Sequence, residues 1–161
     1  MAITDVMLGA GLALAGLIAL EDFTERRIHL WLMIAFCGMG IAYTLLLHPA
    51  LFWTTIATNL LLVTLIWLTV CIWFRLKGET NIMDNLLGWG DVVMLVGLAV
   101  WLPPTYFVAV YFAGTLVALS AWAVLQFYKK IPEEYPIPLA GWLALVFMTG
   151  LPLSAYSSFI L

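Results

Sequence analysis

Two aspartates, Asp22 and Asp91, lie against long apolar segments of the chain rather than in its polar connections. Asp22 follows an apolar run that ends at Leu20, and it precedes the Arg26-Arg27 pair by about one helical turn, roughly 6 Å. Asp91 lies inside another apolar run, from Leu86 to Leu102. An acid at the edge of a membrane or below its surface is costly unless it is paired or used. Both aspartates are therefore candidate catalytic residues.

Two carboxyl groups that meet in a medium of low dielectric constant can share one proton. The ionised group then activates a water molecule, and the protonated group donates a hydrogen bond to a peptide carbonyl. This is the chemistry of aspartic proteases. Because such groups titrate as a pair, the sequence does not assign the proton to Asp22 or to Asp91.

Two glycines, Gly88 and Gly90, precede Asp91 where the predicted helix enters the membrane. Without Cβ atoms they let another backbone approach closely, and a helix that starts there offers N–H and C=O groups to an unwound substrate. The alternative interpretation is that these glycines only allow helices to pack. Asp91 would then cap its own helix or pair with Arg75 or Lys77.

The composition is that of an integral membrane protein. Of the 161 residues, 65% are apolar and 9% are charged, against roughly 25% charged in an average soluble domain. The formal net charge is −3, and no Lys/Arg-rich stripe exists to bind a phosphate backbone. We therefore exclude a water-soluble enzyme, a disordered scaffold and a nucleic-acid binder, and expect one membrane domain over residues 1–161, without a soluble domain.

Six apolar segments approach the roughly 20 residues that a membrane span requires, which predicts an all-α bundle of six transmembrane helices. The segments run from Ile3 to Leu20, Leu30 to Leu47, Leu51 to Phe74, Leu86 to Leu102, Thr105 to Phe127 and Ile137 to Leu161.

The basic residues predict the orientation of this bundle. Every Lys and Arg lies in a connection that follows an odd-numbered span: Arg26, Arg27, Arg75, Lys77, Lys129 and Lys130. The positive-inside rule places these connections in the cytoplasm and both termini outside. Asp22 and Asp91 then lie near the cytoplasmic face.

These motifs together resemble the prepilin leader peptidase family of GxGD-type membrane aspartic proteases. The family carries its first aspartate in D-x5-[IL]-P-[DN], and the segment from Asp22 to Ile28 reproduces the spacing up to the aliphatic residue. Its second aspartate lies in G-x-G-D-x-K, and Gly88-Trp89-Gly90-Asp91 reproduces the first four positions. A proline-containing segment that opens the last span looks like Pro136-Ile137-Pro138-Leu139-Ala140-Gly141. The resemblance covers essentially the whole chain.

The resemblance implies an aspartic endopeptidase of the cytoplasmic (inner) membrane of a prokaryote, with Asp22 and Asp91 as the catalytic pair. Gly88, Gly90 and Pro138 would support the site or hold substrate. The implied partners are prepilin-like membrane precursors, in which a short basic leader precedes an apolar helix and is cut just after a glycine. No metal or organic cofactor is implied, and the cytoplasmic insertion with paired C-x-x-C motifs of the larger members is missing, as in a peptidase-only form.

Two departures from the family pattern concern the neighbours of the aspartates. His29-Leu30 replaces the usual Pro-Asn, and Val93 replaces a Lys that would favour the ionised form of Asp91 or hold a substrate acid. We expect His29 to be an interfacial residue beside Arg26 and Arg27; the alternative is that it contacts the active site or the substrate.

Two other functions remain open from the sequence. The aspartates could bind a proton or cation in a small transporter or assembly subunit, since acids in membrane segments also mark ion paths. A conduction path would need polar groups toward the outer face, where the chain has Asp5, His48 and little else. The other possibility is an inactive relative of the peptidases that acts as a scaffold.

Overall fold

The chain folds into a bundle of α-helices in the computed structural model, which describes residues 3–77, 89–128 and 137–157. Helices are the only regular elements in these ranges: α1 (Ile3–Thr24), α2 (Leu30–Leu47), α3 (Phe52–Leu76), α5 (Trp89–Trp101), α6 (Pro104–Phe127) and α7 (Leu139–Ser157). Helices α1, α2, α3 and α6 are each long and apolar enough to cross a membrane. The predicted all-helical fold is confirmed, with these four helices able to span a membrane by their length and composition.

The first helix extends beyond the apolar run that predicted it. It continues past Leu20 to Thr24, so that Glu21 and Asp22 belong to its last turns. The helix continues past the apolar run because a change from apolar to polar side chains does not interrupt backbone hydrogen bonds. The helix stops where Arg26 takes a positive φ of 56°, the left-handed conformation that commonly terminates helices.

Prolines shift two of the other helix starts. Helix α6 begins at Pro104, one residue before the predicted Thr105, because a proline suits the first helical position, where no N–H partner is needed. Helix α7 begins at Leu139, two residues after the predicted Ile137. Ile137 precedes Pro138, and a residue directly before a proline disfavours the helical conformation. Helix α3 begins one residue later and ends two residues later than predicted.

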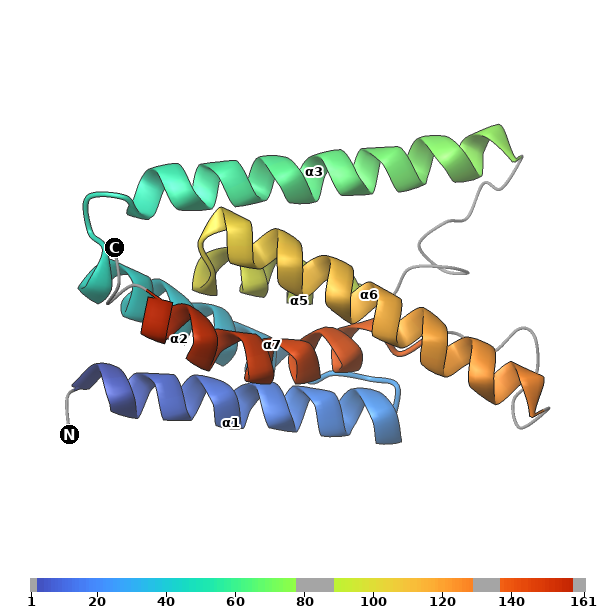
Figure 1. Cartoon of the computed structure of the whole chain (residues 1–161), viewed down its shortest axis with the longest axis horizontal. Helices are drawn as coiled ribbons and strands as arrows, with labels where there is room; N and C mark the ends of the chain where they lie inside the picture. The colour runs from blue at the N-terminus through green and yellow to red at the C-terminus, as the bar shows by residue number, and fades with distance from the viewer. Residues whose placement is uncertain (1–2, 78–88, 129–136, 158–161) are drawn as a thin grey trace.

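The helices run alternately up and down (Figure 1), so that α1 and α3 end, and α7 begins, at one end of the bundle. We call this the aspartate end. Helix α7 packs against α1 and α6, and α5 packs among α2, α3 and α7. Helix α3 lies at the edge of the bundle, and its buried residues all lie in its first half. These residues are Phe52, Asn59 and Val63.

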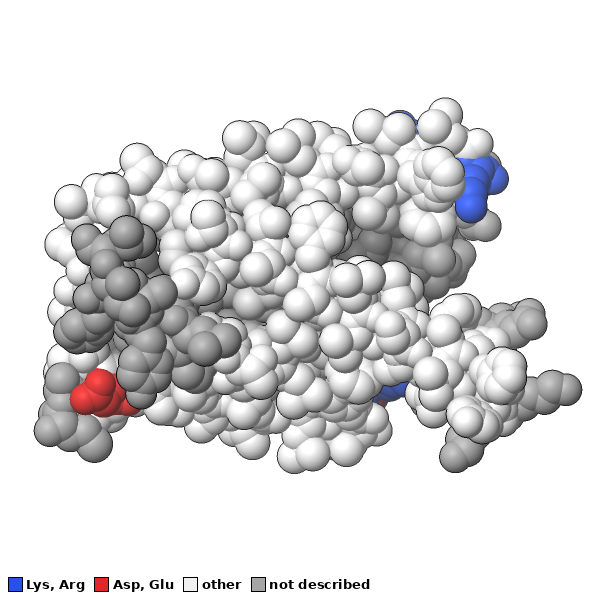
Figure 2. Space-filling model, viewed as in Figure 1, with Lys and Arg blue, Asp and Glu red and all other residues white. Residues whose placement is uncertain are grey.

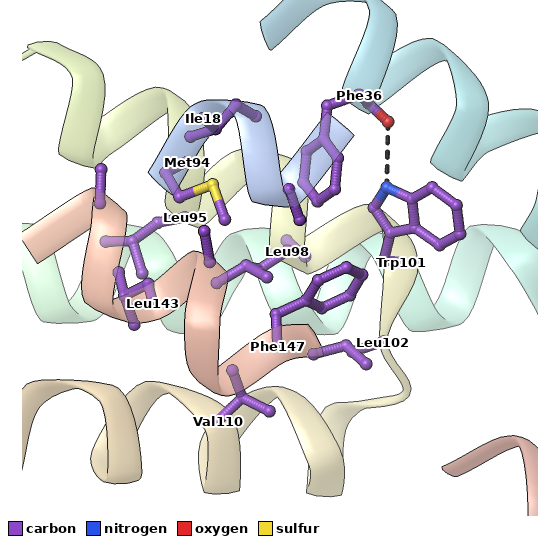
Figure 3. Close-up of a cluster of buried hydrophobic side chains, with 14 of the residues drawn as sticks. Ile18, Phe36, Met94, Leu95, Leu98, Trp101, Leu102, Val110, Leu143 and Phe147 are labelled. Atoms are coloured by element: carbon purple, nitrogen blue, oxygen red, sulfur yellow. Dashed lines mark hydrogen bonds between the residues drawn. The ribbon is translucent and has the colours of Figure 1, made fainter. Parts of the chain in front are cut away.

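The core is a cluster of large apolar side chains around α5 and α7 (Figure 3). Trp101 fills the space beside Gly11 and Gly40, where a Cβ atom at Gly40 would lie 2.7 Å from the indole ring. Its Nε1 donates a 3.0 Å hydrogen bond to the carbonyl oxygen of Phe36. The indole thereby joins the end of α5 to α1 and α2.

Two polar side chains from other helices satisfy the carbonyl groups at the end of α5. Asn59 Nδ2 donates hydrogen bonds to the carbonyl oxygens of Ala99 at 2.8 Å and Leu102 at 2.7 Å. Thr44 Oγ1 donates to the carbonyl oxygen of Val100 at 2.7 Å. The last carbonyl groups of a helix have no partner within it and are costly to bury unpaired, so these bonds fix the end of α5 that is remote from Asp91.

Candidate active site

Asp22 lies in the last turns of α1 and faces the beginning of α7. Its side chain is buried, with 8% of the residue's surface exposed. Its Oδ2 accepts a 2.6 Å hydrogen bond from the backbone N–H of Gly141. A residue 119 positions away along the chain is thus the partner of the first predicted aspartate.

Asp91 lies in the first turn of α5 and faces the same segment. Its Oδ1 accepts a 2.8 Å hydrogen bond from the backbone N–H of Ala140, and the residue is half-buried. Asp91 therefore binds the N-terminus of a helix other than its own.

The beginning of α7 brings the two aspartates together. Ala140 and Gly141 are consecutive, with Cα atoms about 3.8 Å apart, so the two carboxylates that bind their N–H groups are neighbours. The first N–H groups of a helix have no partner within it, and its N-terminus carries a partial positive charge. The segment thus supplies donors and a favourable field to two acids at once.

The approach of Asp22 to α7 depends on the absence of a side chain at Gly141. A Cβ atom there would lie 3.0 Å from Asp22 Oδ2 and 3.2 Å from the ring of Phe23. The ring of Phe23 also packs edge-on against Trp142, with 5.1 Å between centroids. Helices α1 and α7 therefore meet closely on both sides of this hydrogen bond.

Two of the three predicted support residues, Gly90 and Pro138, lie within the described parts of the chain. Gly90 lies in the first turn of α5, where a Cβ atom would lie 3.2 Å from Ile28 Cδ1. Pro138 directly precedes α7, and its carbonyl oxygen accepts a 3.3 Å hydrogen bond from the N–H of Trp142. Both residues thus adjoin the aspartates, whereas Gly88 lies outside the described residues.

The connection between α1 and α2 is held by a contact that the sequence analysis did not anticipate. His29 is exposed and binds Glu21. The backbone N–H of His29 donates to Glu21 Oε2 at 2.9 Å, and the ring Nδ1 lies 2.8 Å from Glu21 Oε1. Glu21 therefore links the end of α1 to the start of α2 at the surface of the protein.

Basic residues gather at the aspartate end among the described parts of the chain. Arg26 and Arg27 follow α1, and Arg75 and Lys77 lie at the end of α3. Figure 2 shows basic atoms toward these helix ends and acidic atoms near the beginning of α1, where Asp5 lies in the first turn. The aspartates thus share one end of the bundle with the basic residues described.

Val93 packs with the apolar interior rather than forming a polar part of the site. It is partly buried against the core cluster that includes Met94 and Leu143. Ile28 and Leu139 pack against the same cluster, so the described neighbourhood of the aspartates includes several aliphatic side chains.

Sequence reasoning missed Ala140 and Gly141 as contacts of the aspartates, although it singled out the segment that contains them. The available signal was a pair of small residues directly after Pro138-Leu139, where a new apolar run begins. Within the described ranges, no group of three or more His, Cys, Asp or Glu side chains is placed to hold a metal ion.

Comparison with protein-family models, with curated proteins and with solved structures finds no match to this chain.

Proposed function

We propose that this protein is a membrane aspartic endopeptidase that cleaves leader peptides from type IV pilin-like precursors at the cytoplasmic face of a prokaryotic cell membrane. The observation that carries the proposal is the convergence of Asp22 and Asp91 on consecutive N–H groups of α7. Two acids separated by 69 positions in the sequence (91 − 22) become neighbours at one site.

The proposed chemistry assigns one proton to the pair. The ionised carboxylate takes a proton from a water molecule as the oxygen of that water attacks the peptide carbonyl carbon. The protonated carboxyl group donates a hydrogen bond to the carbonyl oxygen. The two hydrogen bonds from α7 use one oxygen of each carboxylate. Held in this way, the carboxyl groups meet little reorganisation when charge develops in the transition state.

The proposed arrangement in the membrane has six spans, with both termini outside and the aspartate end in the cytoplasm. The described basic residues at that end support this orientation. A precursor with an apolar helix would lie in the bilayer beside the bundle, and its basic leader would stay in the cytoplasm, close to Asp22 and Asp91.

The valine at position 93, where the family usually has a lysine, affects which substrates we expect the protein to prefer. Because Val93 is apolar and packs with the core, this side chain offers no cation to a substrate acid. We therefore expect weaker dependence on an acidic residue near the cut site than a lysine at this position would give.

The experiment is cleavage of a leader-bearing pilin-type precursor by the purified protein in lipid. Asp22→Asn and Asp91→Asn are compared with the wild type, because asparagine keeps an oxygen that can accept the hydrogen bond from α7 but cannot share a proton as an acid. Asp5→Asn makes the same change at the opposite end of α1 and is the control. We expect cleavage by the wild type and by Asp5→Asn, and its loss in both other variants.

Other outcomes would point to the other functions. Proton or cation flux that requires Asp22 and Asp91, without cleavage of any leader-bearing precursor, would identify a transporter. A wild type without cleavage or flux, whose cellular role survives Asp22→Asn, would identify a scaffold. Cleavage that survives either substitution would refute the proposed mechanism.

A further inference from the structure

The connection from α1 to α2 is closed by two hydrogen bonds to one carboxylate. Glu21 accepts the backbone N–H of His29 at one oxygen, at 2.9 Å, and lies 2.8 Å from the ring Nδ1 at the other. We call this pair of contacts the Glu21–His29 clasp. Residue 29 must supply both a backbone donor and a side-chain donor, and a proline would supply neither.

The clasp joins the residue before Asp22 to His29, the residue after Ile28, and the side chain of Ile28 lies against the residue before Asp91. Glu21 directly precedes Asp22 on α1. His29 directly follows Ile28, whose Cδ1 lies 3.2 Å from the position of a Cβ atom at Gly90, the residue before Asp91. A change in the clasp would therefore move Ile28 relative to the first turn of α5.

The same connection contains a backbone conformation that costs free energy. Arg26 has a φ of 56°, which is unfavourable for a residue with a Cβ atom. The connection therefore needs a compensating contact to keep this shape. Among the described residues, the Glu21–His29 clasp is a charge-assisted contact that joins the two ends of this connection.

We infer that His29, acting through Glu21, is a positioning residue for the Asp22–Asp91 pair. This inference rests on the proposed peptidase function. The clasp keeps Ile28 packed on Gly90, which sets the place of Asp91 relative to Asp22. His29 itself does not touch the reacting atoms, so it affects the rate of the chemical step rather than the binding of substrate.

The test compares His29→Leu with His29→Asn in the full-length protein in lipid, using a leader-bearing precursor as substrate. Asparagine places an N–H donor at the δ position, where the His ring has Nδ1, whereas leucine has no donor. We expect His29→Leu to lower kcat about three- to fivefold, because the contact is charge-assisted but open to solvent, with KM unchanged. His29→Asn should keep kcat within about twofold of the wild type.

A double-mutant cycle with Glu21→Gln shows whether His29 acts through Glu21. We expect the Glu21→Gln/His29→Leu variant to be no slower than the slower single variant, because Glu21→Gln removes the charge and His29→Leu the side-chain donor of the same contact. Thermal unfolding of each variant checks that the loss of rate is not a loss of folded protein.

Three results would overturn the inference. These are a wild-type kcat in His29→Leu, an equal loss in His29→Asn and His29→Leu, and a change in KM alone, which would mean that His29 contacts the substrate. A wild type that cleaves no leader-bearing precursor would instead refute the proposed function, and with it the catalytic role of the clasp.

Discussion

The N–H group of Gly141 donates a 2.6 Å hydrogen bond to Asp22, and a Cβ atom at Gly141 would lie 3.0 Å from the oxygen that accepts it. The small size of this residue is therefore part of the geometry that brings α7 to the aspartate. Any side chain at position 141 must displace the carboxylate or the ring of Phe23.

Gly141→Ala is expected to reduce the rate of cleavage by about two- to fivefold, because the carboxylate or the ring of Phe23 must move by a few tenths of an ångström to admit the methyl group, and a misplacement of about 1 Å costs about 100-fold. The measurement is kcat on a leader-bearing precursor. Gly9→Ala is the matched control, since a Cβ atom at Gly9 meets nothing within 4 Å. Equal rates for the two variants would show that the close approach of Asp22 to α7 is not required.

Gly40→Val is expected to lower the free energy of unfolding by about 1–3 kcal/mol, because the new side chain must displace Trp101 from its packed position. A Cβ atom at Gly40 would lie 2.7 Å from the indole ring. Denaturant titration in detergent micelles measures the effect. Gly38→Val, two residues away in the same helix, is the control because a Cβ atom at Gly38 meets nothing within 4 Å; a similar loss there would contradict the steric explanation.

Asn59→Leu is expected to lower the free energy of unfolding by about 1–2 kcal/mol, because it leaves the carbonyl groups of Ala99 and Leu102 without this donor. Thr44→Val removes the bond to Val100 and should cost about 1 kcal/mol. The same titration measures both.

The control for Thr44→Val is Thr58→Val, because the exposed Thr58 hydroxyl binds a carbonyl group of its own helix. We expect Thr58→Val to change stability by less than about 0.5 kcal/mol. A Thr44→Val variant as stable as Thr58→Val would show that the bond to Val100 does not hold the end of α5.

Arg26→Gly is expected to be more stable than Arg26→Ala by about 1 kcal/mol. Both changes remove the charge, but only glycine accepts a φ of 56° without a steric cost. Comparing the unfolding free energies of the two variants isolates the backbone term. Equal stabilities would mean that the connection relaxes to a negative φ when the arginine side chain is lost.

The helices themselves were predictable because apolar runs of near-spanning length leave few other folds in a membrane. Their exact ends were less accessible. Helix α1 continues through Glu21 and Asp22 to Thr24, since backbone hydrogen bonds continue after the side chains become polar. The start of α7 at Leu139 depends on Pro138 rather than on hydropathy. The six-span count stays a prediction.

The candidate site was predictable as residue types but not as contacts. An aspartate beside or inside an apolar run is conspicuous in a sequence, so Asp22 and Asp91 stood out individually. Their partners are backbone N–H groups, which every residue except proline has, and only the position where α7 begins makes those of Ala140 and Gly141 available. The Glu21–His29 clasp was equally hidden, because it depends on the left-handed turn at Arg26.

The most direct test of the central claim is the cleavage rate of the Asp22→Asn/Asp91→Asn double variant, measured beside both single variants with a leader-bearing precursor in lipid. If the two carboxyl groups act as one catalytic unit, each single variant loses nearly all activity and the double variant loses no more than either. A double variant whose loss is the product of two partial losses, or a single variant that cleaves at the wild-type rate, would contradict a shared catalytic role for Asp22 and Asp91.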